Sequence, residues 1–335
     1  MKRSTVFFIT AILGIAILAG GCGMKNEPAA SKYPEKSITM IVPFSVGGGL
    51  DLTARELEKS ATKHLGQPLV VVNRPGGAGT IGWNELAAAN PDGYTLGLVS
   101  TEIVLHPLYS QTKYHYPTAL EPIAQISSSP PVLIVLSKQP WRNLDDLAAY
   151  AKTHPGQLKF AHGGIGTINH VVGETFGKAA GITLGQVPFR GGSEIAAAVL
   201  GGHVQVGICG IPAIKEHVKN GTIRILAFSG DKRLSDPDLK DVPTFKEQGF
   251  DVVFSYWLGI GAPKGLPADV KAKLVAGFKE MINSADFIEN QTRMGQQMDY
   301  LDSRQTTHKW LEENQKYNTV IQETGIADLI KAQKK

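Results

Sequence analysis

Short continuous runs of apolar residues recur along the chain between more polar segments. A strand covered on both faces shows such a run, whereas a half-exposed strand alternates with a period of two. We therefore expect buried strands at residues 38–44, 69–72, 95–99, 132–136, 158–161, 204–208, 223–228 and 252–260.

Apolar residues at helical spacing fill the segments between these runs. Residues 51–65 carry Leu52, Leu57, Ala61 and Leu65 on one face. Further helices are expected at 83–89, 144–153, 170–180, 194–200 and 213–219. This alternation of strands and helices predicts an α/β protein with parallel sheets.

The C-terminal part has a different pattern. From Pro267 onward we expect helices only, at 267–283, 285–294 and 303–323, packed on a first lobe. The Ser/Pro stretch 127–131 is the best candidate for the point where the chain passes from a first lobe to a second. We expect the chain to return to the first lobe within 251–257. Lobe 1 would then comprise 33–130 and 253–335, lobe 2 would comprise 131–252, and a cleft and a hinge would join them.

Residues 1–21 have the pattern of a secretory signal peptide. Lys2 and Arg3 precede an apolar stretch over 6–19, and small residues follow. The stretch is shorter than the roughly 20 apolar residues that a spanning helix needs. No other segment is apolar enough to span a membrane.

The signal ends in a sequence that resembles a bacterial lipobox, Leu-Ala-Gly-Gly-Cys at 18–22, although Ala19 stands where a large aliphatic residue is usual. We expect Cys22 to be lipidated and 22–32 to form a tether. Plain cleavage and an uncleaved anchor remain as alternatives.

Composition narrows the function classes. The 335 residues are 42% hydrophobic and 19% charged, as in globular proteins. Loss of Lys2 and Arg3 with the leader leaves 32 basic against 30 acidic residues. This small excess of positive charge does not indicate a protein that binds nucleic acid. Cys209 is then the one cysteine besides Cys22, so no internal disulfide is expected.

Catalytic and cofactor motifs are absent from the sequence. It contains no G-x-S-x-G elbow, no P-loop and no H-x-x-x-H or C-x-x-C spacing, so no catalytic residue, metal site or cofactor is expected. An enzyme would need Ser193 or Cys209 as its nucleophile, and neither lies in a nucleophile motif. The G-x-G-x-x-G spacing at 77–82 is separated from its strand by Asn-Arg-Pro, and we interpret it as a turn into a helix.

Glycine-rich turns follow two of the expected strands and lead into helices. The first turn contains Phe44, Ser45, Gly47, Gly48, Gly49 and Asp51. Glycine lets the backbone approach a ligand, and a helix start offers free N–H groups and a positive dipole end. We expect an anion site there with Asp51 as the N-cap, although a plain tight turn is the alternative.

The second turn contains His162, Gly164, Gly166, Thr167, Asn169 and His170. Thr167 and Asn169 would add side-chain hydrogen bonds, whereas His170 would either contact the ligand or support the site from behind. A third glycine turn holds Arg190 and Gly191. Arg190 would pair with a carboxylate of the ligand, or alternatively with a protein acid or solvent.

Ordered motifs run through nearly the whole mature chain. They are Tyr-Pro-Glu-Lys at 33–36, Ile-Val-Pro-Phe at 41–44, Leu-Gly-Gln-Pro at 65–68, Val-Asn-Arg-Pro-Gly at 72–76, Pro-Asp-Gly-Tyr-Thr-Leu at 91–96, Pro-Gly-Gln-Leu at 155–158, Gly-Ile-Gly-Thr at 164–167, Val-Pro-Phe-Arg-Gly at 187–191 and Asp-Val-Pro-Thr at 241–244. With these motifs the chain resembles the tripartite tricarboxylate transporter receptors, also called the Bug or TctC family of extracytoplasmic binding proteins.

The resemblance implies a two-lobed periplasmic-binding-protein fold of type II that holds an organic acid between its lobes. It implies that the loops 44–51 and 162–170 hold a carboxylate, although the family often has serine at the position of His162. Ser100, Thr101 and Cys209 would also face the cleft. Glu102 would repel a second carboxylate or attract an amino group.

The expected function is capture of a small organic acid by cleft closure and delivery to integral-membrane permease subunits. The protein would be exported, as a monomer, and lipid-anchored on the outer face of the cell membrane or periplasmic. A sensory receptor for the same solutes is the alternative, and the sequence does not name the acid.

Overall fold

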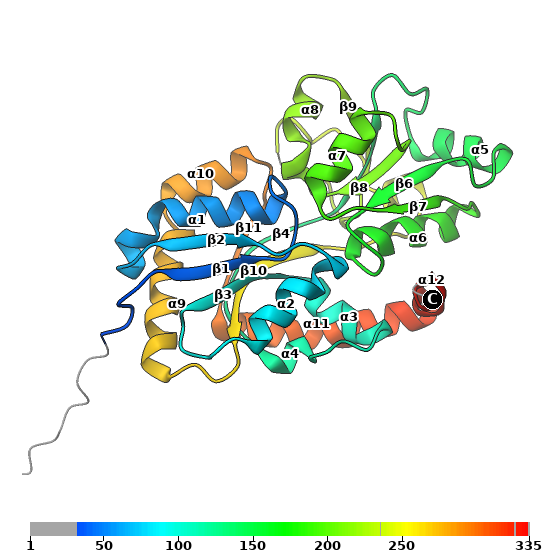
Figure 1. Ribbon diagram of the computed structural model, residues 1–335. Helices are drawn as coiled ribbons and strands as arrows, with labels where there is room; N and C mark the ends of the chain where they lie inside the picture. The colour runs from blue at the N-terminus through cyan, green and yellow to red at the C-terminus, as the bar shows by residue number, and fades with distance from the viewer. Residues whose placement is uncertain (1–31, 235, 325, 334–335) are drawn as a thin grey trace, which may run out of the picture. The chain divides into compact units, whose positions relative to one another are not determined.

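The computed structural model describes residues 32–234, 236–324 and 326–333, and Tyr33–Lys335 form one compact unit (Figure 1). The expected signal peptide, the lipidation at Cys22 and nearly all of the tether lie outside the described residues. Within the described residues, the helices are all too short or too polar to cross a membrane.

The first sheet has six strands in the order β11-β4-β10-β3-β1-β2. Strands β1 (Ile38–Val42), β2 (Leu69–Asn73) and β3 (Thr95–Ser100) run parallel. Strands β4 (Leu120–Ser129), β10 (Tyr256–Pro263) and β11 (Met298–Asp302) join them through antiparallel pairs, β10 with β3 and β4, and β11 with β4.

Two groups of helices flank the first sheet (Figure 1). One group is α1 (Gly49–Leu65), α9 (Ala268–Ile282) and α10 (Ala285–Arg293), which contact one another. The other group is α2 (Thr80–Ala88), α3 (Glu102–Tyr109), α4 (Tyr116–Ala119) and α11 (Ser303–Thr324). The last helix, α12 (Ile326–Gln333), contacts α3 and α11 and also α6.

The second sheet has five strands in the order β7-β6-β8-β5-β9. They are β5 (Val132–Leu136), β6 (Lys159–His162), β7 (Gly185–Pro188), β8 (Val206–Cys209) and β9 (Ile223–Phe228), and β5 runs antiparallel to β8 and β9. Its helices are α5 (Leu144–Thr153), α6 (Ile168–Ala180), α7 (Gly192–Leu200) and α8 (Lys215–Lys219). The chain enters this sheet between Ser129 and Val132 and leaves it after Phe228.

Every expected strand is present, with ends that differ by a few residues, and the α/β fold with two sheets is confirmed. The expectation of parallel sheets was only partly correct, because β10 and β5 run antiparallel to their neighbours. The expectation of a purely helical tail was wrong, because β11 pairs with β4 at the edge of the first sheet. The tail does pack on the first sheet, where α11 contacts β4 and α3.

Strand β4 was not predicted from the sequence because polar residues interrupt its buried apolar positions. Gln125 and Ser127 are almost inaccessible, and no continuous apolar run marks the strand. The tail supplies acceptors for the donors of Gln125: the Gln125 N–H donates to Thr306 Oγ1 (3.1 Å), and Gln125 Nε2 donates to the Asp299 carbonyl (2.9 Å). Pairing between distant segments, rather than local hydrophobicity, therefore defines this strand.

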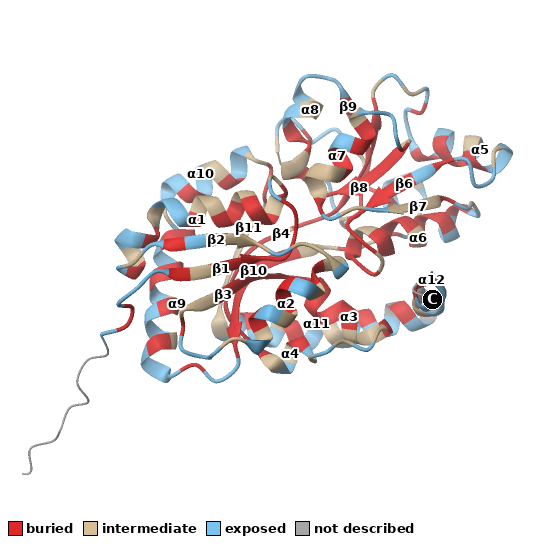
Figure 2. Ribbon diagram, in the orientation of Figure 1, coloured by how far each residue is buried: buried red, intermediate tan, exposed pale blue. Residues whose placement is uncertain are grey.

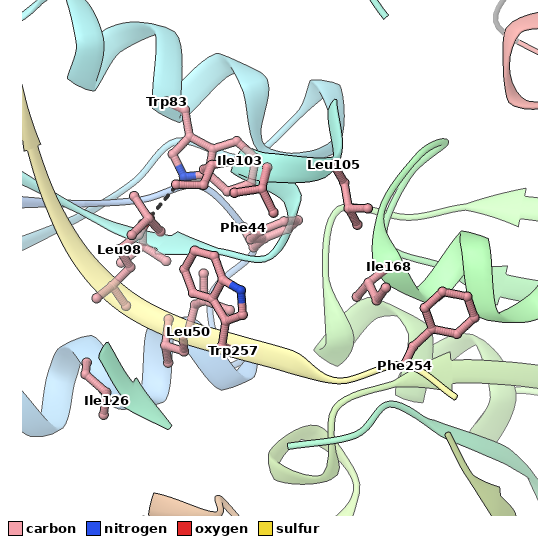
Figure 3. Packing of buried hydrophobic residues seen from close by; sticks show 14 of the residues in the cluster. Phe44, Leu50, Trp83, Leu98, Ile103, Leu105, Ile126, Ile168, Phe254 and Trp257 are labelled. Carbon is pink, nitrogen blue, oxygen red and sulfur yellow. Dashed lines mark hydrogen bonds between the residues drawn. The ribbon is translucent and has the colours of Figure 1, made fainter. Parts of the chain in front are cut away.

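The apolar core reaches the carboxyl ends of the first-sheet strands (Figures 2 and 3). Phe44, two residues beyond β1, packs edge-on against Trp83 with ring centroids 6.0 Å apart. The Trp83 indole N–H donates to the Leu98 carbonyl of β3 (3.0 Å), which is the dashed line in Figure 3. This packing anchors the start of the loop that leads into α1.

Candidate functional site

Loops from both sheets line a small, partly open cavity of about 60 Å³, here called the inner cavity. The first sheet contributes Phe44, the start of α1 and Glu102, and the second contributes Thr167, Asn169 and the start of α7. Ser129 of β4, Tyr256 of β10 and Gln296, which precedes β11, are further polar residues of the lining.

The N-terminus of α1 opens into this cavity without a capping side chain. Gly48 is the N-cap, and Gly48, Gly49 and Leu50 all line the cavity. Among the described residues no acceptor takes the N–H groups of Gly49, Leu50 and Asp51. These donors and the positive end of the helix dipole favour a negatively charged group at this point.

Asp51 is not the N-cap of α1, so that expectation was wrong; it lies in the first turn and holds the preceding loop. Its Oδ2 accepts from the Gly47 N–H (2.8 Å) and Arg55 Nε (3.0 Å), and its Oδ1 accepts from Asn73 Nδ2 (3.0 Å). Gly47 has φ 76°, a left-handed conformation that glycine adopts without strain. The carboxylate thus shapes the loop rather than repelling an anion at the helix start.

The ionised form of Asp51 is favoured in the folded protein. Burial alone raises the pKa of this carboxyl, but the bonds from Arg55, Gly47 and Asn73 outweigh burial, and the pKa is lower than that of a free aspartate.

The start of α7 approaches the start of α1 from the second sheet. Gly191 is its N-cap, and Gly191 and Gly192 line the inner cavity. A Cβ placed on Gly48 would lie 3.7 Å from the Gly192 nitrogen, and one placed on Gly191 would lie 2.4 Å from Ser45 Oγ. The Ser45 N–H also donates to the Arg190 carbonyl (3.2 Å), so the two loops touch directly.

The start of α6 also reaches the cavity, but its donors are largely occupied. Thr167 is the N-cap: its Oγ1 accepts from the His170 N–H (3.4 Å) and donates to the Gly164 carbonyl (2.8 Å). The Ile168 N–H donates to Glu102 Oε1 (3.3 Å). Of the first turn, the Asn169 N–H alone has no acceptor among the described residues.

Both histidines of this loop are inaccessible, and they support its backbone. His162 Nδ1 accepts from the Gly164 N–H (3.2 Å), and its Nε2 pairs with Gln186 Oε1 (3.0 Å). His170 Nδ1 accepts from the Gly166 N–H (3.2 Å). Burial and the neighbouring His170 lower the pKa of His162 to about 3, so its imidazole is neutral near neutral pH.

The expected polar residues after β3 are engaged within the protein. Ser100 Oγ donates to Glu102 Oε2 (2.5 Å), and Thr101 Oγ1 accepts from the Trp257 N–H (3.0 Å). Glu102 itself is 1% exposed and lines the inner cavity. Burial raises the pKa of this carboxyl group, which faces any ligand in the inner cavity.

A second, open groove of about 720 Å³ adjoins the inner cavity and is here called the outer groove. Gly164 and the exposed Arg190 line it, together with Lys113 and the glycine turn at Gly77–Gly79. Gly166 lies against the ring of Tyr109, where a Cβ would come within 2.5 Å of a ring carbon. Arg190 therefore lies in the outer groove and outside the lining of the inner cavity.

Cys209 lies in the apolar core of the second sheet, whereas its neighbour Gly210 lines the inner cavity. Burial raises the pKa of the Cys209 thiol to about 12. The described residues contain no group of three or more His, Cys, Asp or Glu side chains placed to hold a metal ion.

Sequence reasoning missed Gln296 and Tyr256. Gln296 is 8% exposed; its Oε1 accepts from the hydroxyls of Ser127 (3.4 Å) and Ser129 (3.3 Å). Its Nε2 lies 3.6 Å from a Cβ placed on Gly49 and has no acceptor among the described residues. No sequence motif around Gln296 predicts its role. It lies beside α1 only because the C-terminal part of the chain returns to the first sheet.

Residues 53–326 match the protein family described as tripartite tricarboxylate transporter family receptor. The protein BugT of Bordetella pertussis is 33% identical over 322 residues, which cover 95% of this chain and 97% of BugT.

Two solved structures are similar over most of the chain. The Rhodopseudomonas palustris protein Rpa4515 with adipate is 27% identical with a TM-score of 0.82 and covers 88% of this chain and 98% of its own. MatC from Rhodopseudomonas palustris with bound malate is 26% identical with a TM-score of 0.80, and the match covers 86% of this chain and 100% of the MatC chain.

Proposed function

This chain belongs to the tripartite tricarboxylate transporter receptor family, and from that premise we propose that it captures a small organic acid by one carboxylate in the inner cavity. It then delivers the acid to the integral-membrane permease subunits of such a transporter. The ligands adipate and malate in the two similar structures, both organic acids, support this ligand class.

One observation carries the proposal: two helix N-termini with free donors, those of α1 and α7, converge on one cavity. The N–H groups of Gly49 and Leu50 from one helix and that of Gly192 from the other have no acceptor among the described residues. Gln296 Nε2 adds a side-chain donor beside Gly49. A carboxylate between these groups would satisfy donors that otherwise have no protein acceptor.

Contacts between the loops of the two sheets support capture by closure. The Ser193 hydroxyl donates to the Val46 carbonyl (2.8 Å), and the Ser45 N–H donates to the Arg190 carbonyl (3.2 Å). Closing excludes water and strengthens each bond to the anion. A ligand that bridges α1 and α7 binds the closed arrangement better and shifts the population toward it.

The remaining parts of the proposal concern location and assembly. The protein is exported, anchored by a lipid on Cys22, and works as a monomer in the periplasm or on the outer face of the cell membrane. We assign it no catalytic role. Ser193 Oγ is bonded to the Val46 carbonyl, and the buried thiol of Cys209 has a raised pKa, so neither is an activated nucleophile.

Titration of the purified chain with a panel of mono- and dicarboxylates, followed by calorimetry and thermal shift, tests the binding step. Gly48→Val is the diagnostic variant, because its methyl groups would fill the gap between the starts of α1 and α7. We expect it to fold normally and to lose binding of every acid that the wild type binds.

Gly185→Ala in β7 is the matched control, since a Cβ there makes only ordinary contacts at 3.5 Å or more. Wild-type affinity in Gly48→Val would refute the assignment of the site. Loss of uptake on deletion of the gene, together with intact signalling, separates delivery to a permease from a sensory role.

A further inference from the structure

Glu102 is a buried carboxylate that faces the inner cavity without a cationic partner. It is the first residue of α3 and is 1% exposed. In the part of the chain that the structure describes, no ion pair includes it. Buried charges in proteins are normally paired, so a cavity beside an unpaired one favours a ligand that supplies the opposite charge.

The immediate partners of Glu102 are all neutral groups that donate to it. Ser100 Oγ donates to one carboxylate oxygen (2.5 Å) and the Ile168 N–H to the other (3.3 Å). The side chains that interact with it electrostatically include the tyrosines Tyr109 and Tyr256, which carry no positive charge. Burial raises the pKa of the Glu102 carboxyl, and the bonds from Ser100 and Ile168 do not outweigh burial. A cation in the cavity would stabilise the ionised form, which these neutral donors stabilise only in part.

The position of Glu102 makes the two ends of the inner cavity chemically different. At the α1 and α7 end, backbone N–H groups and Gln296 Nε2 are free donors. At the α6 end, Glu102 already occupies the Ile168 N–H, which leaves the Asn169 N–H as the one first-turn donor without an acceptor among the described residues. The cavity is therefore complementary to a molecule with an acid group at one end and a donor at the other.

We propose that Glu102 determines specificity, selecting carboxylates that carry an ammonium group over dicarboxylates of the same length. The proposal rests on the function proposed above. An ammonium group would pair with Glu102 and stabilise its ionised form, whereas a second carboxylate would either meet a like charge or require Glu102 to take up a proton.

Calorimetric titration of the mature chain at neutral pH tests this with five four-carbon acids. The probes are the α-, β- and γ-aminobutyrates, which place the ammonium group at different distances from the acid, together with butyrate and succinate. We expect at least one aminobutyrate to bind the wild type ten-fold or more tightly than butyrate and succinate. Glu102→Gln should abolish that preference and strengthen succinate binding, while Glu102→Asp should keep the order of the wild type.

The controls separate this proposal from the general one. Glu312→Gln, at an exposed position of α11, removes a carboxylate that does not line the inner cavity. It should leave the affinities for all five acids unchanged. If butyrate or succinate binds the wild type as tightly as every aminobutyrate, the role of Glu102 is refuted while carboxylate binding stands. If a folded wild type binds none of the acids in either panel, the proposed function fails as well. The order of affinities of the five acids for the wild type tests the proposal even if Glu102→Gln does not fold.

Discussion

The hydroxyl groups of Ser45 and Ser193 lie 3.1 Å apart, although 148 positions separate them along the chain. Ser45 belongs to the loop after β1 of the first sheet, and Ser193 lies in the first turn of α7 on the second. Gly191 permits this approach, because any side chain there would occupy the position of the Ser45 hydroxyl.

Gly191→Ala should therefore weaken ligand binding without unfolding the protein. The added Cβ would lie 2.4 Å from Ser45 Oγ, and separation of the two loops relieves that clash at no cost to either sheet. We expect the dissociation constant for the bound acid to rise ten-fold or more, measured by calorimetry, with an unchanged melting temperature for the ligand-free protein. Gly185→Ala is the control, and equal affinities for the two variants would contradict the contact.

Gln296→Glu should reduce affinity for the acid by roughly ten- to a hundred-fold, the range for a lost hydrogen bond to a charged group. The substitution keeps an oxygen for the hydroxyls of Ser127 and Ser129 and replaces the Nε2 donor beside Gly49 with a second oxygen. Gln297→Glu introduces the same charge at the next residue, which does not line the inner cavity. If both variants lose the same affinity, general electrostatic repulsion explains the loss and the role of Gln296 Nε2 is contradicted.

Asp51→Asn should lower the free energy of unfolding by about 1–3 kcal/mol. Both oxygens of Asp51 accept hydrogen bonds, so the NH2 group of the new asparagine side chain must point either at the donors of Gly47 and Arg55 or at the donor of Asn73. The folded-state pKa of Asp51 is lowered, so its contribution to stability is present above the pKa of the unfolded chain and is lost as the pH falls through the folded value. Denaturant titration across acidic pH should show the wild type and variant converging. The exposed Asp251→Asn is the control, and a difference that grew toward low pH would contradict the assignment.

His162 should make the protein less stable as the solution is acidified from neutral pH. Its folded-state pKa is lowered to about 3, so between that value and the unfolded pKa near about 6.5 only the unfolded chain takes up the proton. The free energy of unfolding should fall by up to about 1.4 kcal/mol per pH unit from this one group. His162→Gln should flatten the profile by that amount relative to the exposed His203→Gln, and parallel profiles would show that His162 does not stay neutral.

The sequence was sufficient for the elements whose signal is local. Continuous apolar runs identified β1, β5 and β9, and glycine turns before apolar helices located the starts of α1, α6 and α7. It was insufficient where burial is polar or depends on distant partners. β4 hides Gln125 and Ser127 inside the sheet, and β11 exists because β4 offers a free edge.

The candidate site divides in the same way. The residue pattern by itself determined the two-sheet α/β class, the family resemblance and a glycine-rich helix start after Phe44, which we propose as the anion site, because strand, glycine turn and helix are adjacent along the chain. The tertiary structure alone decided that α7 offers more free donors opposite α1 than α6 does, that Glu102 occupies the Ile168 N–H at the start of α6, and that Gln296 faces Gly49. Those relationships depend on how two sheets and a returning tail pack together, and no spacing within one segment encodes them.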